Sequence, residues 1–268
     1  MSNDDQSVAA KVRYINAQWK DDDDAPRIGS RESRRANTSF QDVRVHNVRS
    51  ELERGEIDLD RSGFTLTTNP TNFTAFTEPE QVERDYYPQM HDLVCKASGA
   101  SAAFAYAHLV RTEKPIDFND GYARFVHCDY NISRLQDMSE TLLEKLEKSA
   151  EPGSTFVWYN TWQPFDNQVQ NNPLACIDWA TLPLDDVIDY YYTGRGRESL
   201  VAAPVYNPAH RFCYFDQMET DEVLVMKQMD PRPERSTYCP HTSFDDPTAK
   251  PDALPRRSIE MRWLAVIN

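Results

Sequence analysis

The 268-residue chain is 40% hydrophobic and 11% aromatic, enough to bury the core of one large domain or two small ones. Its formal net charge of −14 argues against nucleic acid or an anionic membrane as the main partner. The first residues do not look like a secretory signal, no stretch approaches the roughly 18 apolar residues of a membrane span, and the five scattered cysteines form no C-x-x-C motif; together these features predict a cytoplasmic protein with reduced thiols.

Residues 1–60 are polar and highly charged, with an acidic run at 21–24 and a basic cluster formed by Arg31, Arg34 and Arg35. Low hydrophobicity and dense charge are typical of solvated segments, so we predict a polar N-terminal arm that is partly extended or disordered. Imperfect alternation over residues 12–15 leaves room for one strand in this arm. A single domain is then expected over residues 61–268.

From residue 64 onward, short β-branched and aromatic segments alternate with turn signals. Two helices interrupt them: one follows Glu78 and stops at Gly99, and the other spans 139–149 with a leucine stripe. The alanine-rich segment 100–111 is predicted as a buried strand, with a helix as the alternative. Strands are expected at 64–68, 100–111, 122–130, 155–162, 174–179, 200–206, 211–215, 222–226 and 258–267. This spacing predicts a mainly β fold with inserted helices, on a double-stranded β-helix (jelly-roll, cupin-like) core.

His127 and Asp129 stand two residues apart in a segment of strand composition. Side chains repeat every second residue along a strand, so both point to one face and can reach one metal ion. Two histidines and one carboxylate are the ligand set of non-haem Fe(II) oxygenases. Either His241 or His210 could be the second histidine, and we prefer His241 because a basic group on the last strand follows it. The alternative is a surface histidine beside a surface aspartate.

The last strand carries Arg256, Ser258, Glu260 and Arg262 on one face. Burying such a face is unfavourable unless its charged groups find partners. A dicarboxylate co-substrate would supply them, because a guanidinium binds a carboxylate through two hydrogen bonds and a serine hydroxyl adds another. An edge strand with a solvated charged face explains the same pattern.

Six short motifs follow one another in a fixed order, and each is modest by itself. They are His127-Cys-Asp129, Asn160-Thr-Trp-Gln-Pro164, Pro173-Leu-Ala-Cys-Ile-Asp178, His210-Arg-Phe-Cys-Tyr-Phe215, His241-Thr-Ser-Phe244 and Arg256-Arg-Ser-Ile-Glu-Met-Arg262. In this order they resemble the fungal and bacterial oxygenase family that includes the oxygenase component of cephalosporin 7α-methoxylation and a fungal meroterpenoid endoperoxidase. The resemblance covers roughly residues 80–268.

The resemblance implies Fe(II) and 2-oxoglutarate as cofactors, and O2 and a small natural product of secondary metabolism as substrates. It implies hydroxylation, desaturation or oxidative ring formation, coupled to decarboxylation of 2-oxoglutarate to succinate. His127, Asp129 and His241 are then the catalytic iron ligands. The other predicted site residues belong to the co-substrate site (Arg256, Ser258, Asn160 and Arg262) or to the substrate pocket (His210, Trp162 and Tyr130).

One position departs from the family pattern, since Gln163 stands where an arginine is usual. A different substrate explains this change, and so does a catalytically silent partner subunit of a homologous oxygenase. A third alternative is an iron dioxygenase on the same barrel that needs no 2-oxoglutarate. The sequence leaves the oligomeric state open, including a homodimer and a heterodimer with a homologous subunit.

Overall fold

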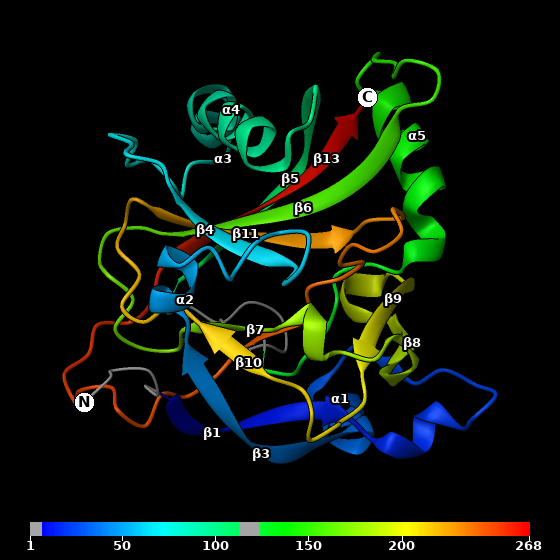
Figure 1. Cartoon of the computed structure of the whole chain (residues 1–268), viewed down its shortest axis with the longest axis vertical. Coiled ribbons are helices and arrows are strands. Elements are labelled where there is room, and N and C mark those ends of the chain that lie inside the picture. Colours follow the sequence, from blue (N-terminus) through cyan, green and yellow to red (C-terminus); the bar gives the residue numbers. More distant parts are fainter. Residues whose placement is uncertain (1–6, 113–123) are drawn as a thin grey trace.

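Two five-stranded sheets face each other and form the framework of the protein, with a three-stranded sheet beside them (Figure 1). The computed structural model describes residues 7–112 and 124–268. Side chains of both large sheets share one buried cluster, in which Trp162 and Leu224 of one sheet join Cys176 and Cys213 of the other. Two sheets stacked over a common core make a double-sheet jelly roll, which confirms the predicted fold class.

The sheet drawn uppermost in Figure 1 has the strand order β4-β11-β6-β13-β5. Its alternating side chains are apolar on both faces: Val223 and Val225 pack outward under the helices, whereas Leu224 and Met226 pack inward. β6 and β13 pair antiparallel along their whole length. The strands are β4 (Phe64–Thr68), β5 (Ala102–Arg111), β6 (Thr155–Pro164), β11 (Glu222–Met229) and β13 (Ser258–Ile267).

The helix predicted after Glu78 is present and covers the outer face of this sheet (Figure 1). It is composed of α3 (Pro79–Gln81), a π-helical turn (Val82–Tyr86) and α4 (Tyr87–Ser98). Gly99 ends it in the left-handed conformation, at φ 71°, and donates its N–H to the Cys95 carbonyl. The predicted alternative for 100–111 is wrong, because β5 forms there.

The second predicted helix begins earlier in the chain than expected. α5 spans Leu135–Lys145 and directly follows a 3₁₀ turn (Ile132–Arg134) capped by the Asn131 side chain. It ends before Glu147, whose φ of 53° is left-handed and stops the helix short of the predicted Pro-Gly break. Its buried face joins Trp158 and Leu264 of the sheet through Leu142 and other apolar residues.

The N-terminal segment differs from the expected arm, because it forms two strands of the second large sheet. β1 pairs with β3 from Ser7↔His46 to Ile15↔Thr38. Val12 and Tyr14 are buried while Lys11 is exposed, so the polar residues that suggested an arm occupy the solvent side of a strand. The order is β1-β3-β10-β7-β12, with β1 (Ser7–Ile15), β3 (Thr38–Asn47), β7 (Leu174–Ile177), β10 (Phe212–Tyr214) and β12 (His241–Ser243).

The three-stranded sheet lies beside the jelly roll and consists of β2 (Arg27–Ile28), β8 (Val187–Tyr192) and β9 (Ser199–Pro204). Two short helices, α1 (Arg31–Asn37) and α2 (Arg49–Glu53), flank β3 along the chain. Among the described helices, none is long and apolar enough to cross a membrane.

Candidate functional site

His127 and His241 are brought together by a bridge between two segments far apart in the sequence. The strand predicted over 122–130 is reduced to isolated bridges, at Phe125 and at His127, and residues 122–123 lie outside the described chain. The His127 N–H donates to the His241 carbonyl at 3.2 Å, and the reverse bond measures 3.0 Å. This antiparallel bridge sets the imidazole rings 4.8 Å apart, centre to centre.

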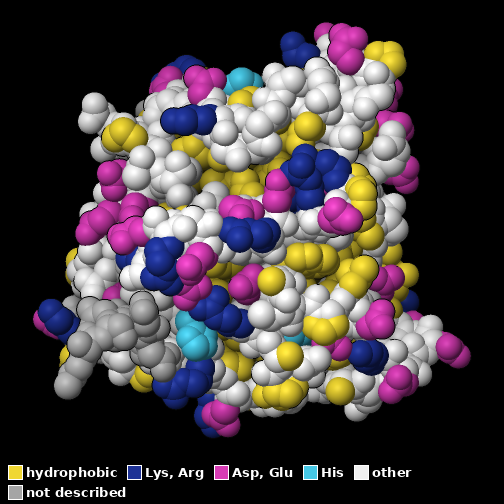
Figure 2. Space-filling view, in the orientation of Figure 1, with side chains coloured by type: hydrophobic (Ala, Val, Ile, Leu, Met, Phe, Trp, Pro, Cys, Tyr) yellow, Lys and Arg dark blue, Asp and Glu magenta, His cyan; other side chains and the backbone are white. Residues whose placement is uncertain are grey.

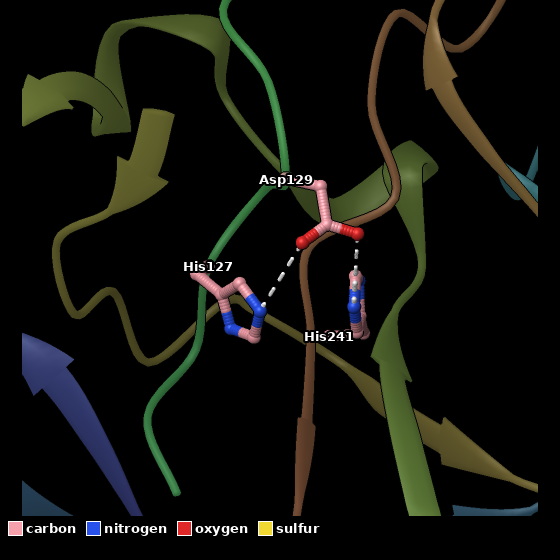
Figure 3. A group of neighbouring side chains, drawn as sticks. All are labelled: His127, Asp129 and His241. Atoms are coloured by element: carbon pink, nitrogen blue, oxygen red, sulfur yellow. Dashed lines mark ion pairs between the residues drawn. The ribbon is translucent and has the colours of Figure 1, made fainter. Parts of the chain in front are cut away.

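Asp129 lies between the two imidazoles, as Figure 3 shows. One carboxylate oxygen is 3.6 Å from His127 Nε2 and the other is 4.0 Å from His241 Nε2. The candidate ligand atoms of all three residues lie within 4.8 Å of one another, in a group that could hold a metal ion. His127 and Asp129, two residues apart, therefore direct their side chains toward the same point. The sequence predicts this from strand periodicity, although the segment is only partly a strand.

Backbone carbonyls fix the orientation of both imidazole rings. His127 Nδ1 lies 2.8 Å from the Phe125 carbonyl, and His241 Nδ1 lies 3.0 Å from the Cys239 carbonyl. A carbonyl only accepts, so each Nδ1 carries the proton and each Nε2 keeps its lone pair for a ligand. Such partners behind the ring are usual for metal-binding histidines.

The electrostatic environment favours the metal-binding forms of the ionisable groups. Burial, reinforced by the neighbouring His241, lowers the pKa of His127 to about 4, so that this ring is neutral near pH 7. Burial alone would raise the pKa of Asp129, but the positive charge of Arg262 and the adjacent histidines hold it below its ordinary value. The pair therefore presents an imidazole lone pair and a full carboxylate charge.

Asn160 and Arg262 contact Asp129 from the inner face of the sheet. They are register partners on β6 and β13. The Asn160 amide donates to one oxygen of Asp129 at 2.5 Å, and Arg262 Nη2 lies 3.3 Å from the other. Arg262 also donates to Glu260 at 3.1 Å, so its charge is shared between two carboxylates. Both residues were predicted to bind 2-oxoglutarate; the structure places them against the candidate metal ligand.

Arg256 and Ser258 form a separate polar group in the same interior. Arg256 is only 1% exposed, donates to the Asn172 carbonyl at 2.5 Å, and stacks 5.1 Å from the centre of the Trp162 ring. Its Nη1 also lies 3.4 Å from Ser243 Oγ, two residues beyond His241. The hydroxyl of Ser258 is buried without a hydrogen-bond partner among the described residues. A buried cation beside an unsatisfied hydroxyl suits an anionic ligand with oxygen acceptors.

A cavity of about 610 Å³ reaches the site from one side. Its wall includes His127, Asp129, Tyr130 and Arg262. Of the three residues predicted for substrate contact, Tyr130 lies in the wall, whereas Trp162 and His210 do not. Trp162 instead packs in the core between the sheets.

His210 occupies a different buried cluster. Its Nδ1 lies 3.0 Å from the Tyr14 hydroxyl and its Nε2 lies 3.3 Å from Asp186. Nε2 faces this carboxylate without a hydrogen bond among the described residues, and His210 is not part of the candidate metal group. Of the two histidines considered as the second ligand, His241 is the one that lies in the candidate group.

Gln163 points away from the site because it is offset by one residue from Trp162 on β6. It accepts hydrogen bonds from Tyr86 at 2.5 Å and from Asn69 at 3.3 Å, and donates to the Thr220 carbonyl at 2.7 Å. The one departure from the family motifs therefore lies under the covering helices, on the outer face of the sheet.

Of the cations in the cavity wall, the sequence analysis singled out Arg262 but not Arg111, Arg134, Lys145 or Arg197. Two of these, Arg134 and Lys145, come from α5 and the turn before it. Together with Met138 they recur at spacings of four and seven residues, so they share one face of α5 and its preceding turn. Placing the helix at 139–149 hid this stripe, because Arg134 and Met138 then fell outside it.

A family model described as "Oxidoreductase/YMDC permease-like domain" matches residues 12–266. The hydroxylase/desaturase efuI of Hormonema carpetanum is 32% identical over 272 residues, which cover 89% of this chain and 88% of that protein. The Fe(II)/2-oxoglutarate-dependent dioxygenase nvfI of Aspergillus novofumigatus is 26% identical over 232 residues, covering 83% of this chain and 82% of that protein.

A solved structure shows the same fold. The iron and alpha-ketoglutarate-dependent endoperoxidase NvfI, in the structure described as having a different conformation, matches with a TM-score of 0.82 at 21% identity, covering 100% of this chain and 99% of that one. The chain belongs to the matched oxidoreductase family, and with it to the Fe(II)/2-oxoglutarate-dependent dioxygenases of fungal secondary metabolism.

Proposed function

We propose that this protein is an Fe(II)- and 2-oxoglutarate-dependent oxygenase that acts on a small secondary metabolite. The observation that carries the proposal is the group of two histidines and one aspartate, of which His127 and Asp129 line a cavity of about 610 Å³. Hydroxylation, desaturation and oxidative ring formation are the outcomes that the relatives' names support, since they include a hydroxylase/desaturase and an endoperoxidase.

The donor set fits Fe(II). His127 and His241 each offer an Nε2 atom, and Asp129 offers a carboxylate. Two imidazoles and one carboxylate leave further coordination positions for a co-substrate and O2. Asn160 and Arg262 hold the carboxylate in place from behind, which makes them positioning residues in this proposal.

The group formed by Arg256 and Ser258 fits the distal carboxylate of 2-oxoglutarate. A guanidinium and a hydroxyl supply donors at one end of the ligand, and Trp162 restricts the arginine by stacking. The unsatisfied buried Ser258 hydroxyl would gain the acceptor that it lacks among the described residues.

Fe(II) and 2-oxoglutarate, when bound, supply the oxidising chemistry: O2 is reduced as 2-oxoglutarate loses CO2 to give succinate, and a hydrogen atom is removed from the substrate. The chain's own contribution is to hold the ligands, to exclude bulk water from a buried site and to orient the substrate in the cavity. Tyr130, which lies in the wall beside Asp129, would contact the substrate.

The alternative of a silent partner subunit was based on Gln163 and on the choice of the second histidine. Gln163 contacts Tyr86, Asn69 and Thr220 on the outer face of the sheet, so it gives that alternative no support. We therefore propose only the oxygenase.

An anaerobic titration with Fe(II) and then 2-oxoglutarate tests the proposal. We expect a visible charge-transfer band between iron and the keto acid, and substrate-dependent succinate formation. His127→Ala, Asp129→Ala and His241→Ala should each abolish the band. His210→Ala is the matched control, because it removes a buried histidine outside the group, and it should retain the band. A wild-type protein without a band, or an Asp129→Ala variant with undiminished turnover, would contradict the proposal.

A further inference from the structure

The cavity wall has a charge that is opposite to that of the protein as a whole. The chain carries a net charge of −14, and Figure 2 shows positive and negative side chains interspersed over one face of the molecule. The wall of the cavity, in contrast, holds five cations and one carboxylate, Asp129, among the residues that the structure describes. The cations are Arg111, Arg134, Lys145, Arg197 and Arg262. A cluster of positive side chains in a protein of negative net charge calls for a specific explanation.

Three of these cations have no acidic partner in the structure. Arg262 is shared between Asp129 and Glu260, but Arg134, Lys145 and Arg197 form no ion pair within residues 7–112 and 124–268. Arg134 is half-buried and makes one hydrogen bond, from Nη1 to the Leu200 carbonyl at 3.3 Å. A guanidinium has five N–H donors, so most of its capacity remains for a ligand.

Two structural elements place these cations around the cavity. Arg134 and Lys145 lie on the face of α5 and its preceding turn that lines the cavity, whereas the opposite face packs on the core. Arg197 comes from the connection between β8 and β9. The bond from Arg134 to Leu200 holds the two elements together close to Arg197.

Much of the rest of the wall is aromatic or apolar, although His108, His127 and Ser199 also line it. It includes Tyr106, Phe125, Tyr130, Tyr190, Tyr192 and Met138. Arg256 and Ser258, the residues proposed for 2-oxoglutarate, are not in this wall. The cations of the cavity are therefore a separate group from the proposed co-substrate clamp.

We propose that the substrate of this oxygenase is an amphipathic anion, with an apolar or aromatic body and a carboxylate or similar acidic group bound by Arg134 and Arg197. This inference rests on the proposed function for the reaction, but the anion site can be tested without turnover. Lys145 adds positive charge on the same face of α5 and contributes less, because an ammonium is more strongly hydrated than a guanidinium and lacks its planar pair of donors.

Two fluorescent probes that share an aromatic body isolate the charge: anilinonaphthalene sulfonate, an anion, and N-phenylnaphthylamine, which is neutral. We expect Arg197→Gln to weaken binding of the anion about tenfold, the usual effect of losing one charge-assisted contact, and to leave the neutral probe unchanged. Arg197 is exposed, so the Arg197→Gln variant should fold. Arg134→Gln should also weaken binding of the anion and leave the neutral probe unchanged. Lys96→Gln, at an exposed cation on α4, is the matched control and should change neither probe.

Three results would overturn the inference: no binding of the anion, equal weakening of both probes, or displacement of the anion by 2-oxoglutarate in proportion to its concentration. The last would assign these cations to the co-substrate. The iron titration of the unmodified protein is independent of these results. A missing charge-transfer band with a charge-selective probe site would refute the oxygenase and leave the anion site standing.

Discussion

At the scale of single residues, both oxygens of the Asp129 carboxylate already have a donor from the protein. Asn160 donates to one and Arg262 lies against the other, and these two residues face each other across β6 and β13. Such a pair fixes the rotation of the carboxylate before a metal binds. Removing either Asn160 or Arg262 should therefore lower the affinity for the metal.

We predict that Asn160→Ala and Arg262→Leu each weaken Fe(II) binding about 10- to 100-fold, the usual effect of losing a partner behind a metal ligand. Anaerobic Fe(II) titration measures the change. Arg257→Gln is the matched control, because Arg257 pairs with Asp166 at the surface. An unchanged dissociation constant in both variants would show that Asp129 needs neither support.

The side chain of Gln163 stabilises the sheet. It connects Tyr86, Asn69 and the Thr220 carbonyl beneath the covering helices, and it is only 1% exposed. Gln163→Ala should lower the free energy of unfolding by about 1–3 kcal/mol, because buried polar partners lose their hydrogen bonds. Urea denaturation measures this loss, with the exposed Gln136→Ala as a control of small effect. A Gln163→Ala protein of normal stability but altered iron affinity would contradict the assignment.

At the scale of elements, a buried lysine ties the end of β11 to the loop before β4. Lys227 is fully buried and lies 2.8 Å from both Asp60 and Asp230. Burial by itself raises the pKa of the Asp230 carboxyl, but hydrogen bonds from Arg232 and Lys227 outweigh it and hold this pKa below its ordinary value. A carboxyl with a lowered folded pKa stabilises the protein at neutral pH and loses this effect as the pH falls.

Asp230→Asn should therefore destabilise the protein by about 3 kcal/mol at pH 7, since it leaves a buried lysine with a single carboxylate partner. The unfolded state begins to take up the proton near the ordinary aspartate pKa of about 4, so the difference from wild type should shrink below that pH. Urea denaturation of both proteins from neutral to acidic pH measures it. A difference that stays constant or widens in acid would refute the proposed role of the charge.

At the scale of the whole molecule, the N-terminal strand is part of the jelly roll. β1 pairs with nine consecutive residues of β3 and buries Val12, Tyr14 and Ile15. Tyr14 also contacts His210, which fixes the loop before β10. Each buried side chain of this size contributes roughly 1.5–3 kcal/mol, and a whole domain has a net stability of only about 5–15 kcal/mol.

Deletion of residues 1–15 should accordingly abolish cooperative thermal unfolding or lower its midpoint strongly, and it should expose the edge of β3 to association. Calorimetry and light scattering measure these two effects. Lys11→Ala, at an exposed position of the same strand, should leave the midpoint nearly unchanged. A truncated protein with the wild-type midpoint would show that the segment is a dispensable arm.

Local sequence determined those features that depend on neighbouring residues. The period of two placed most of the later strands and put His127 with Asp129 and Ser258 with Glu260 and Arg262 on common faces. The six motifs identified the family, and helix-stop chemistry located Gly99. The start of α5, which was predicted too late in the chain, is also a local feature. The helix starts early because the Asn131 side chain caps the turn before it, and the leucine pattern used for the prediction does not include this cap.

Only the tertiary structure decided which distant segments meet. The bridge between His127 and His241 and the burial of the N-terminal strand both follow from strand pairing across the sheets. The cavity joins cations from α5 and from the β8–β9 connection in the same way. Pairing of this kind is set by the packing of whole sheets over a shared core, and periodicity within one segment does not encode it.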